Sequence, residues 1–195
     1  MAYYTKNEAR QAAYTTINKS FRNNSKSILE SEFRDTKSYD KFDVFLSHSS
    51  KDADLVLGVK ALLEKHGLKV YVDWHDDPQA SRENVTKETA ELLRARMKQS
   101  KSLIFMATNN ASNSKWMPWE LGYFDGFSSG SVAVLPLVEH SSDSFKGQEY
   151  LDIYPKVDKG YYSDTGSAET FVKKDDGWQT LSKFGSGNIC WNKYS

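Results

Sequence analysis

One stretch of the chain combines a carboxylate with aromatic rings at helical spacing. Pro118 is well placed as a first helical residue, so Glu120 falls in the first turn, where the helix dipole favours an ionised carboxylate. Trp116 precedes this helix and can lie beside the carboxylate, while Tyr123 is one turn along on the same face. Such a site suits a ligand with a flat ring and a developing positive charge. The alternative is structural, because a first-turn Glu satisfies free backbone N–H groups and Trp residues often pack at a sheet edge.

A second polar cluster, Ser47-His48-Ser49, comes directly after a short apolar run at 42–46 that is typical of a buried strand. Apolar residues at helical spacing follow over 53–65, with Ser49, Ser50 or Asp52 as candidate caps and Gly67 just past the end. In open α/β sheets, ligands bind beyond the carboxyl ends of the strands. The cluster therefore lies where such a fold places chemistry, unless it only turns the chain and caps the helix.

Alternating strands and helices position these residues. The pattern predicts strands over 42–47, 68–73, 103–107 and 132–138, a weaker fifth between 150 and 157, and helices over 53–65, 84–98 and from 118 through 124. Pro136 indicates a strand end or an edge. The alternation predicts an α/β fold in which a parallel sheet carries helices on both faces.

The two ends of the chain differ from this middle part. Residues 1–36 are predicted to form a polar helical arm, interrupted at 23–25, that packs on the domain or on another copy of the chain. Residues 170–172 and 178–181 flank a Gly-containing turn, which predicts a β-hairpin in the tail. We therefore expect an arm at 1–36, a main domain at 37–160, and an extension at 161–195 that covers the sheet edge.

Bulk composition narrows the class of protein. The 195 residues carry 26 basic and 26 acidic side chains, which gives no electrostatic reason to expect nucleic acid or an anionic membrane as a partner. A single cysteine, Cys190, excludes an internal disulfide framework. There is neither an apolar run of membrane-spanning length nor a signal-peptide core. We expect a cytoplasmic protein.

Three motifs together resemble the Toll/interleukin-1 receptor (TIR) domain family. Residues 39–48, Tyr-Asp-Lys-Phe-Asp-Val-Phe-Leu-Ser-His, resemble its opening motif, and 67–73, Gly-Leu-Lys-Val-Tyr-Val-Asp, resemble its second strand. Residues 112–121, with Ser114, Trp116, Glu120 and Leu121, resemble its Ser-x-Trp-x-x-x-Glu-Leu signature. The motifs occur in the family's order over about 39–140, and the likeness is closest to free-standing bacterial members.

The resemblance implies a flavodoxin-like three-layer fold with a parallel sheet in the order 2-1-3-4-5. It also implies cleavage of NAD between nicotinamide and ribose, with Glu120 as the catalytic residue and with neither a cofactor nor a metal. The expected substrate-binding residues are Ser47, His48, Ser49, Trp74, Asp77, Trp116 and Tyr123. Many bacterial relatives act in antiphage defence, where a cyclic ADP-ribose isomer signals to a separate effector, and the family self-associates through the loop after strand two, here 74–82.

One carboxylate is chemically sufficient for this reaction. Ordinary glycoside cleavage generally uses two carboxyl groups, one of which protonates the leaving group. Nicotinamide leaves NAD as a neutral molecule from a cationic ring and needs no proton. An ionised carboxylate then has only to stabilise an oxocarbenium-like ribose, by charge or by a brief covalent bond. Water gives ADP-ribose, and an adenine nitrogen or ribose hydroxyl of the same molecule gives a cyclic isomer.

Other functions remain as alternatives. A non-catalytic TIR scaffold would act by association with other TIR domains, but scaffold members often lack the glutamate that this chain keeps. The 74–82 loop lacks the glycine common in the family, which puts the mode of self-association in question. A phosphoacceptor receiver domain is rejected, because the predicted strands end in Ser47-His48-Ser49 and Ala107-Thr108-Asn109 rather than in the required aspartates. Nucleoside deoxyribosyltransferases are a minor alternative.

Overall fold

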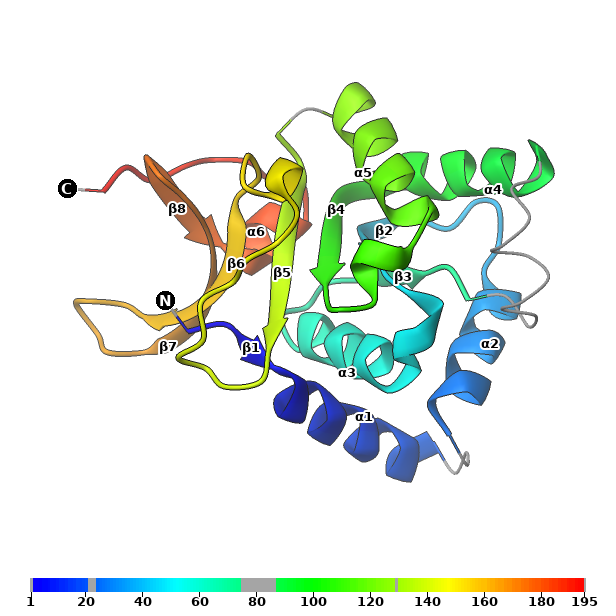
Figure 1. Ribbon diagram of the computed structural model, residues 1–195, viewed down its shortest axis with the longest axis horizontal. Helices are drawn as coiled ribbons and strands as arrows, with labels where there is room; N and C mark the ends of the chain where they lie inside the picture. Colours follow the sequence, from blue (N-terminus) through cyan, green and yellow to red (C-terminus); the bar gives the residue numbers. More distant parts are fainter. Residues whose placement is uncertain (1, 21–23, 75–86, 129, 195) are drawn as a thin grey trace.

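A single twisted sheet organises the molecule (Figure 1). The computed structural model describes residues 2–20, 24–74, 87–128 and 130–194. Within them the sheet has eight strands, ordered β3-β2-β4-β5-β6-β7-β8, with β1 paired to β5. The strands are β1 (Tyr4–Thr5), β2 (Phe42–Ser47), β3 (Val70–Val72), β4 (Ser100–Ala107), β5 (Val132–Val138), β6 (Lys156–Tyr161), β7 (Ala168–Lys174) and β8 (Gly177–Thr180).

The predicted strand order is confirmed. The first five strands of the βα alternation are β2 to β6, they are all parallel, and β2 lies between β3 and β4. In the sequence numbering used for the prediction this is the order 2-1-3-4-5. The hairpin β7–β8 then extends the sheet in antiparallel fashion beyond β6, as the tail pattern predicted.

Helices cover both faces because the strand side chains alternate between two apolar cores. Val44 and Leu46 pack under α1, α2, α3 and α6, whereas Phe45 between them packs under α4 and α5. The helices are α1 (Lys6–Ser20), α2 (Ser25–Asp35), α3 (Ala53–Glu64), α4 (Lys87–Lys98), α5 (Trp116–Phe127) and α6 (Leu181–Gly185). Gly67 follows α3 with a φ of 76°, the left-handed conformation expected of a terminating glycine.

Four sequence predictions about strands need correction. The third strand begins earlier than predicted, at Ser100. The second strand is shorter than predicted, Val70–Val72, and the fifth begins at Lys156 and not near residue 150. Pro136 lies inside β5, which has neighbours on both sides. It is tolerated because β6 pairs with β5 only at Val134, whose N–H donates to Pro155 O over 2.9 Å. Pro136 lies two residues further along the same side of β5, where β6 offers no partner. The missing N–H of proline therefore breaks no strand hydrogen bond.

The N-terminal arm packs on the body of its own chain. Gly58 in α3 lets the α1 backbone approach so closely that a Cβ at this position would lie 1.8 Å from Ala9 O. Ala9 and Ala13 are correspondingly buried in the core under α3. Asn24 caps α2 by accepting a 2.9 Å hydrogen bond from Ser27 N, which explains why the helical arm divides there.

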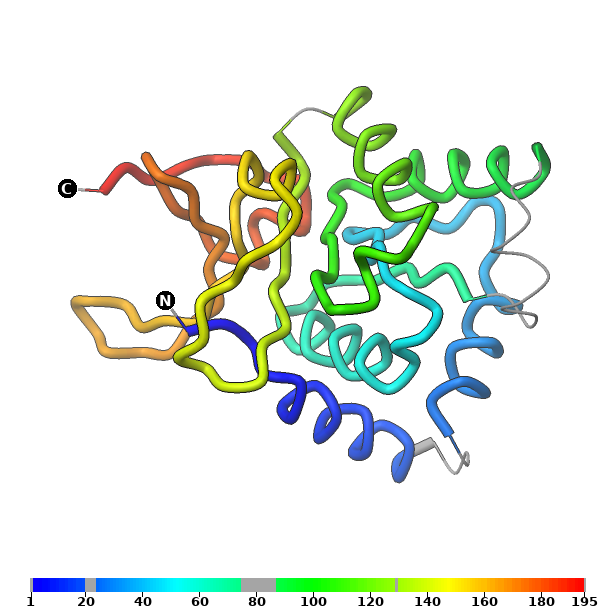
Figure 2. Tube along the Cα trace, viewed as in Figure 1, coloured from blue at the N-terminus to red at the C-terminus, as the bar shows by residue number. Residues whose placement is uncertain are grey.

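Residues just before α1 and in its first turn join the arm to the far strands. Tyr4 pairs with Leu137 of β5, and its hydroxyl lies 2.7 Å from Thr170 Oγ1 on β7. Glu8 and Lys159 of β6 form an ion pair of 2.5 Å. Figure 2 shows the blue N-terminal and red C-terminal segments on the same side of the molecule, near β6 to β8.

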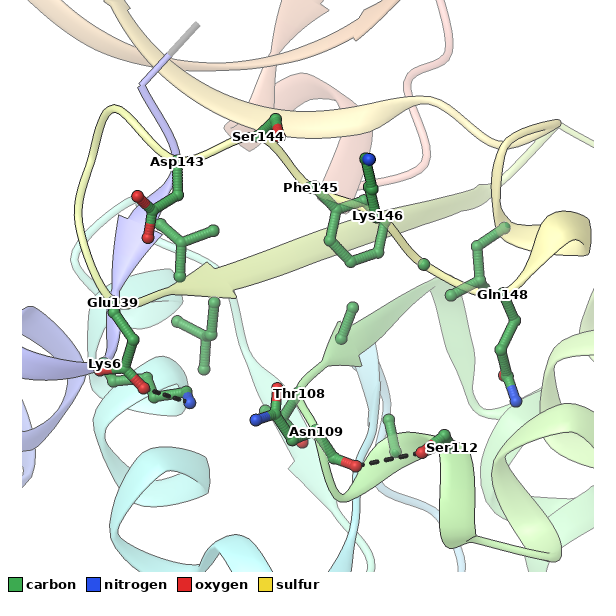
Figure 3. A pocket seen from close by; sticks show the side chains of 16 residues that line it. Lys6, Thr108, Asn109, Ser112, Glu139, Asp143, Ser144, Phe145, Lys146 and Gln148 are labelled. Atoms are coloured by element: carbon green, nitrogen blue, oxygen red, sulfur yellow. Dashed lines mark hydrogen bonds and ion pairs between the residues drawn. The ribbon is translucent and has the colours of Figure 1, made fainter.

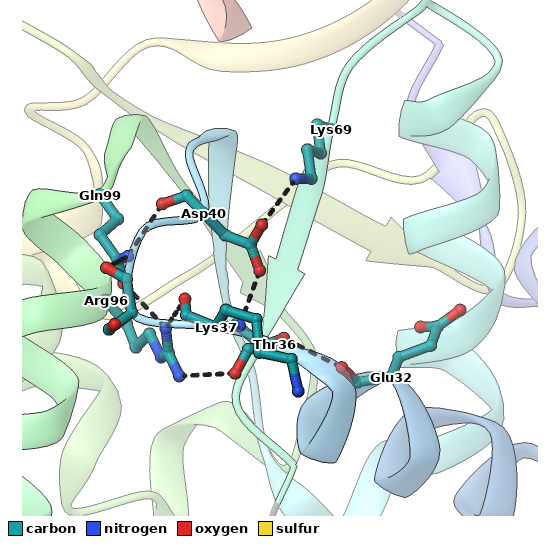
Figure 4. A network of polar contacts seen from close by, with 8 residues as sticks. Glu32, Thr36, Lys37, Asp40, Lys69, Arg96 and Gln99 are labelled. Atoms are coloured by element: carbon teal, nitrogen blue, oxygen red, sulfur yellow. Dashed lines mark hydrogen bonds and ion pairs between the residues drawn. The ribbon is translucent and has the colours of Figure 1, made fainter.

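A polar network fixes the segment between α2 and β2 (Figure 4). The buried Arg96 guanidinium donates to Lys37 O over 2.7 Å and to Thr36 O over 3.2 Å, while Gln99 Nε2 donates to Asp40 O over 2.8 Å. The backbone N–H of Lys37 bonds the Asp40 carboxylate and lowers its pKa, with the neighbouring positive charges acting in the same direction. The arm is thus anchored just before the first strand of the alternation.

Candidate active site

Glu120 is held by a serine from the neighbouring strand end. Ser47, the last residue of β2, donates its hydroxyl to Glu120 Oε2 over 2.5 Å, and the two side chains are buried. Glu120 exposes only 3% of its surface. The predicted meeting of the strand-one turn with the glutamate is therefore present in the structure. This hydrogen bond fixes the direction in which the carboxylate points.

The predicted start of the helix that carries Glu120 is wrong by two residues. Helix α5 begins at Trp116, so Pro118 is its third residue and Glu120 its fifth. No acidic residue lies in the first turn, and the helix dipole falls off beyond that turn. Trp116 and Glu120, four residues apart, share one helix face. The Ser47 hydrogen bond, more than the dipole, therefore positions the carboxylate.

Aromatic rings from two other elements line the same edge of the sheet. The His48 ring stacks on Trp74 with 5.5 Å between centroids and 10° between planes, and both side chains are buried. His48 Nδ1 lies 2.9 Å from Leu46 O, a geometry that places the proton on Nδ1. Ser49 Oγ accepts a hydrogen bond from Lys51 N and so caps the short 3₁₀ turn Ser50–Asp52.

Two buried indole N–H groups at this edge have no hydrogen-bond partner among the described residues. They are Nε1 of Trp74 and Nε1 of Trp116. An unpaired buried donor costs free energy, about 1–3 kcal/mol in proteins, unless a bound molecule accepts its hydrogen bond. Both tryptophans are predicted to bind substrate, but the sequence gives no indication that their N–H groups are buried without a partner.

Hydrogen bonds of the Asp52 carboxylate, which the sequence pattern did not predict, form a clasp between the turn after β2 and the loop after β4. Asp52 does not cap α3 with its side chain. Its carboxylate instead accepts hydrogen bonds of 2.6 Å from Thr108 Oγ1 and of 2.6 Å from Asn110 Nδ2, both just after β4. The clasp ties the turn that carries Ser47 to the loop that leads into α5. In the sequence, Asp52 is recognisable only as a residue type that caps helices. Its partners lie 56 and 58 residues away, so no local pattern indicates them.

The remaining site residues are placed as follows. Tyr123 stacks on Trp119 with a centroid distance of 5.6 Å, and the Arg94 guanidinium lies over both rings. These contacts place Tyr123 against Trp119 and Arg94 of α4, and its predicted substrate contact stays a prediction. Asp77, and the 75–82 part of the loop predicted to mediate self-association, lie outside the described residues.

Burial also perturbs a tyrosine below the site. The pKa of Tyr71 lies well above its usual value, mainly because the hydroxyl is desolvated and also because Asp73 lies beside it. Tyr71 donates to Asp73 Oδ1 over 3.2 Å, so it stays protonated and holds the carboxylate that immediately precedes Trp74. In the ranges that the structure describes, no three potential metal ligands from His, Cys, Asp and Glu gather, and no helix has the length and apolarity to cross a bilayer.

Comparisons with known proteins agree with this geometry. The family model described as "TIR domain" matches residues 44–163. The chain is 44% identical over 180 residues to the "Probable 3' cyclic ADP-D-ribose synthase ThsB'" of Bacillus cereus (strain MSX-D12), covering 88% of this chain and 91% of that protein. It is 36% identical over 83 residues to the "Putative cyclic ADP-D-ribose synthase TIR2" of Cytobacillus dafuensis, covering 42% of this chain and 22% of that protein.

Proposed function

The chain belongs to the TIR domain family, and from this premise we propose that it cleaves NAD between nicotinamide and ribose. The single observation that carries the proposal is the buried Glu120 carboxylate fixed by Ser47 at the carboxyl end of β2. In this class of sheet, that edge is where ligands bind. The product is nicotinamide with ADP-ribose or a cyclic ADP-ribose isomer, and the enzyme serves in bacterial defence.

Each neighbouring side chain has a role in this chemistry. Glu120 stabilises the positive charge that develops on the ribose as the C–N bond to nicotinamide breaks, and the bonding electrons leave with the nicotinamide ring. Ser47 keeps the carboxylate aimed at that carbon. The indole N–H groups of Trp74 and Trp116 can donate to acceptors on the substrate, such as the nicotinamide carboxamide oxygen. The stacked His48 and Trp74 rings form an apolar wall suited to a flat ring.

The names of the relatives favour the cyclising branch. Both curated relatives are named as synthases of a cyclic ADP-D-ribose, and one name specifies the 3' isomer. Cyclisation needs the intramolecular nucleophile to reach the ribose before water does, which a buried carboxylate site supports. We therefore propose a cyclic isomer as the main product and ADP-ribose as the minor one.

The test is incubation of the purified protein with NAD, followed by liquid chromatography and mass spectrometry of the products. Glu120→Gln keeps the shape of the side chain and an oxygen that can accept from Ser47 but removes the charge. We expect it to reduce nicotinamide release by at least about 100-fold, comparable to the loss of one transition-state electrostatic contact. Glu91→Gln, an exposed carboxylate change on α4, is the matched control and should retain full activity. Equal nicotinamide release by Glu120→Gln and wild type would exclude the proposed role.

We also propose that the chain self-associates through the 74–82 loop and that a separate effector responds to the product. Trp74, the described residue of that loop, is buried against His48, so a movement of the loop would also change the site. A site completed by a second copy predicts that specific activity rises with protein concentration. A flat profile at constant substrate would exclude that arrangement.

A further inference from the structure

A second cleft lies beside the Glu120 site, at the carboxyl ends of β4 and β5. It has a volume of about 470 Å³ and runs between the end of β4 and the segment at 143–148. Figure 3 shows Phe145 and Lys146 on one side of it, across from Thr108 and Asn109. The volume falls in the range of small-molecule sites, about 300–1,000 Å³. None of the residues proposed above to bind substrate lines this cleft.

The lining combines an apolar floor with a polar rim. Ala107, Ala111, Leu137 and Leu151 form the floor, and the partly buried Phe145 ring lies against it. Glu139 is paired with Lys6 over 2.6 Å, and the Asp143 carboxylate accepts from His140 N over 2.8 Å. Lys146 is exposed, and no ion pair of its ammonium group occurs among the described residues.

The aromatic ring, the amide side chains and the lysine of this lining suit the base and the phosphate of an adenosine 5'-phosphate. An aromatic ring on an apolar floor offers a stacking surface for a base. Asn and Gln amides are the side chains that pair with the donor and acceptor edge of adenine, and Asn109 and Gln148 both line the cleft. The unpaired ammonium of Lys146 is suited to a phosphate. Lys6 balances the charge of Glu139, and the lining as a whole carries two lysines against two carboxylates.

The cleft and Glu120 are close enough to hold one dinucleotide. Ser47 at the end of β2 pairs with Phe105 of β4, and Ala107 of β4 pairs with Pro136 of β5. One to two strand spacings, about 5–10 Å, therefore separate the end of β2, which holds Glu120, from the ends of β4 and β5, which border the cleft. Ala111 and Leu151 of the cleft belong to the same apolar core as Trp116, on the face of the sheet that α5 covers.

We propose that this cleft binds the adenosine 5'-phosphate half of NAD while the nicotinamide ribose lies at Glu120. This inference rests on the proposed function. Adenine held there is kept away from the reacting carbon, so its ring nitrogens cannot attack it. A hydroxyl of the adenosine ribose, between the two places, becomes the intramolecular nucleophile. Its oxygen forms the new C–O bond, nicotinamide departs with the electron pair of the broken C–N bond, and the hydroxyl proton passes to solvent.

Lys146→Ala tests the cleft, because the side chain is exposed and its loss leaves the fold intact. We expect the KM for NAD to rise about tenfold at unchanged kcat, the effect of losing one charge-assisted contact to phosphate. Nicotinamide mononucleotide, which lacks the adenylate half, should be cleaved equally by both proteins. AMP should inhibit competitively against NAD and should inhibit the variant about tenfold less. Lys98→Ala, an exposed lysine at the opposite edge of the sheet, is the control and should behave as wild type.

Several results would overturn the inference. They are an unchanged KM for NAD in Lys146→Ala, inhibition by AMP that is not competitive with NAD, or a product in which adenine nitrogen is joined to ribose. Failure of the proposed function has a different signature, namely nicotinamide release that does not depend on Glu120 or does not occur. In that case calorimetric binding of AMP to wild type, weakened about tenfold by Lys146→Ala, would support the cleft, and absence of binding would exclude it.

Discussion

Replacing Gly58 by alanine should destabilise the protein, although the same change in an ordinary helix stabilises it. Alanine is favoured over glycine by about 1 kcal/mol in a helix interior. Gly58, however, faces α1, and an added Cβ would lie 1.8 Å from Ala9 O and 2.5 Å from Ala9 C. Because these are backbone atoms, no rotamer change can relieve the clash, and α1 as a whole must move until the separation reaches at least 3.0 Å.

The magnitude follows from two opposing effects. Overpacking of a well-packed contact costs about 1–3 kcal/mol, and a rigid backbone obstacle puts this case towards the upper end. After the gain in helix propensity we expect a net loss of about 1–2 kcal/mol in the free energy of unfolding. For a chain of this size that lowers Tm by about 2–8 °C. Amide hydrogens of α1 should also exchange faster, because the helix is displaced from α3.

Gly122→Ala on α5 is the matched control. A Cβ there meets no heavy atom within 4 Å, so only the propensity effect remains and Tm should rise by about 2–4 °C. The measurements are thermal and urea unfolding of the three proteins, together with hydrogen exchange of α1 peptides. If Gly58→Ala were as stable as wild type and α1 kept its protection, the packing argument would be refuted.

Three further predictions concern the site and the arm. Ser47→Ala removes the 2.5 Å donor to Glu120 and should lower kcat for nicotinamide release about tenfold at similar Tm; unchanged kcat would remove Ser47 from the mechanism. Asp52→Ala leaves two partly buried donors unpaired and should cost about 1 kcal/mol in urea unfolding, whereas a neutral result would show that the clasp is replaced by water. Burial raises the pKa of Glu8, but the bonds from its lysine and threonine partners outweigh this and lower the pKa below its ordinary value. The stabilisation is therefore present above the ordinary pKa of a glutamate and is lost as the pH falls through the lowered pKa. The Tm difference between wild type and Glu8→Gln should therefore shrink in acid, and a constant difference would contradict the assignment.

Much of the fold was predictable because local pattern and global architecture agree. The apolar run ending at Ser47, the alternation of strands with amphipathic helices, and the resemblance gave the sheet order and the meeting of Ser47 with Glu120, which the structure confirms. The two-residue strand β1 was missed, because a segment so short has no periodicity and forms only by pairing with Leu137 and Val138.

Side-chain contacts between distant segments were beyond the sequence pattern. Asp52 is of a residue type that commonly caps helices, and nothing in the neighbouring sequence indicates that its carboxylate reaches the loop after β4. The start of α5 was misplaced because Pro118 is favourable at the first helical position, whereas here it is accommodated at the third, where the N–H is also free of an intrahelical partner. The predicted division at residues 36 and 160, and the contact of Asp77 with substrate, stay predictions.

The N-terminal strap also bears on the order in which the chain folds during its synthesis. Its partners are among the most distant in sequence, with separations of 133 residues for Lys6 with Glu139, 151 for Lys159 with Glu8, and 166 for Tyr4 with Thr170. Contacts of such high order form late, since the loop between them must close first. The segment at residues 4–8 is therefore synthesised long before its partners on β5, β6 and β7, and its contacts are complete only after β7 has emerged. Until then Tyr4 lacks its hydroxyl partner on β7, so this junction between the arm and the far strands is secured only after residue 170 has been synthesised.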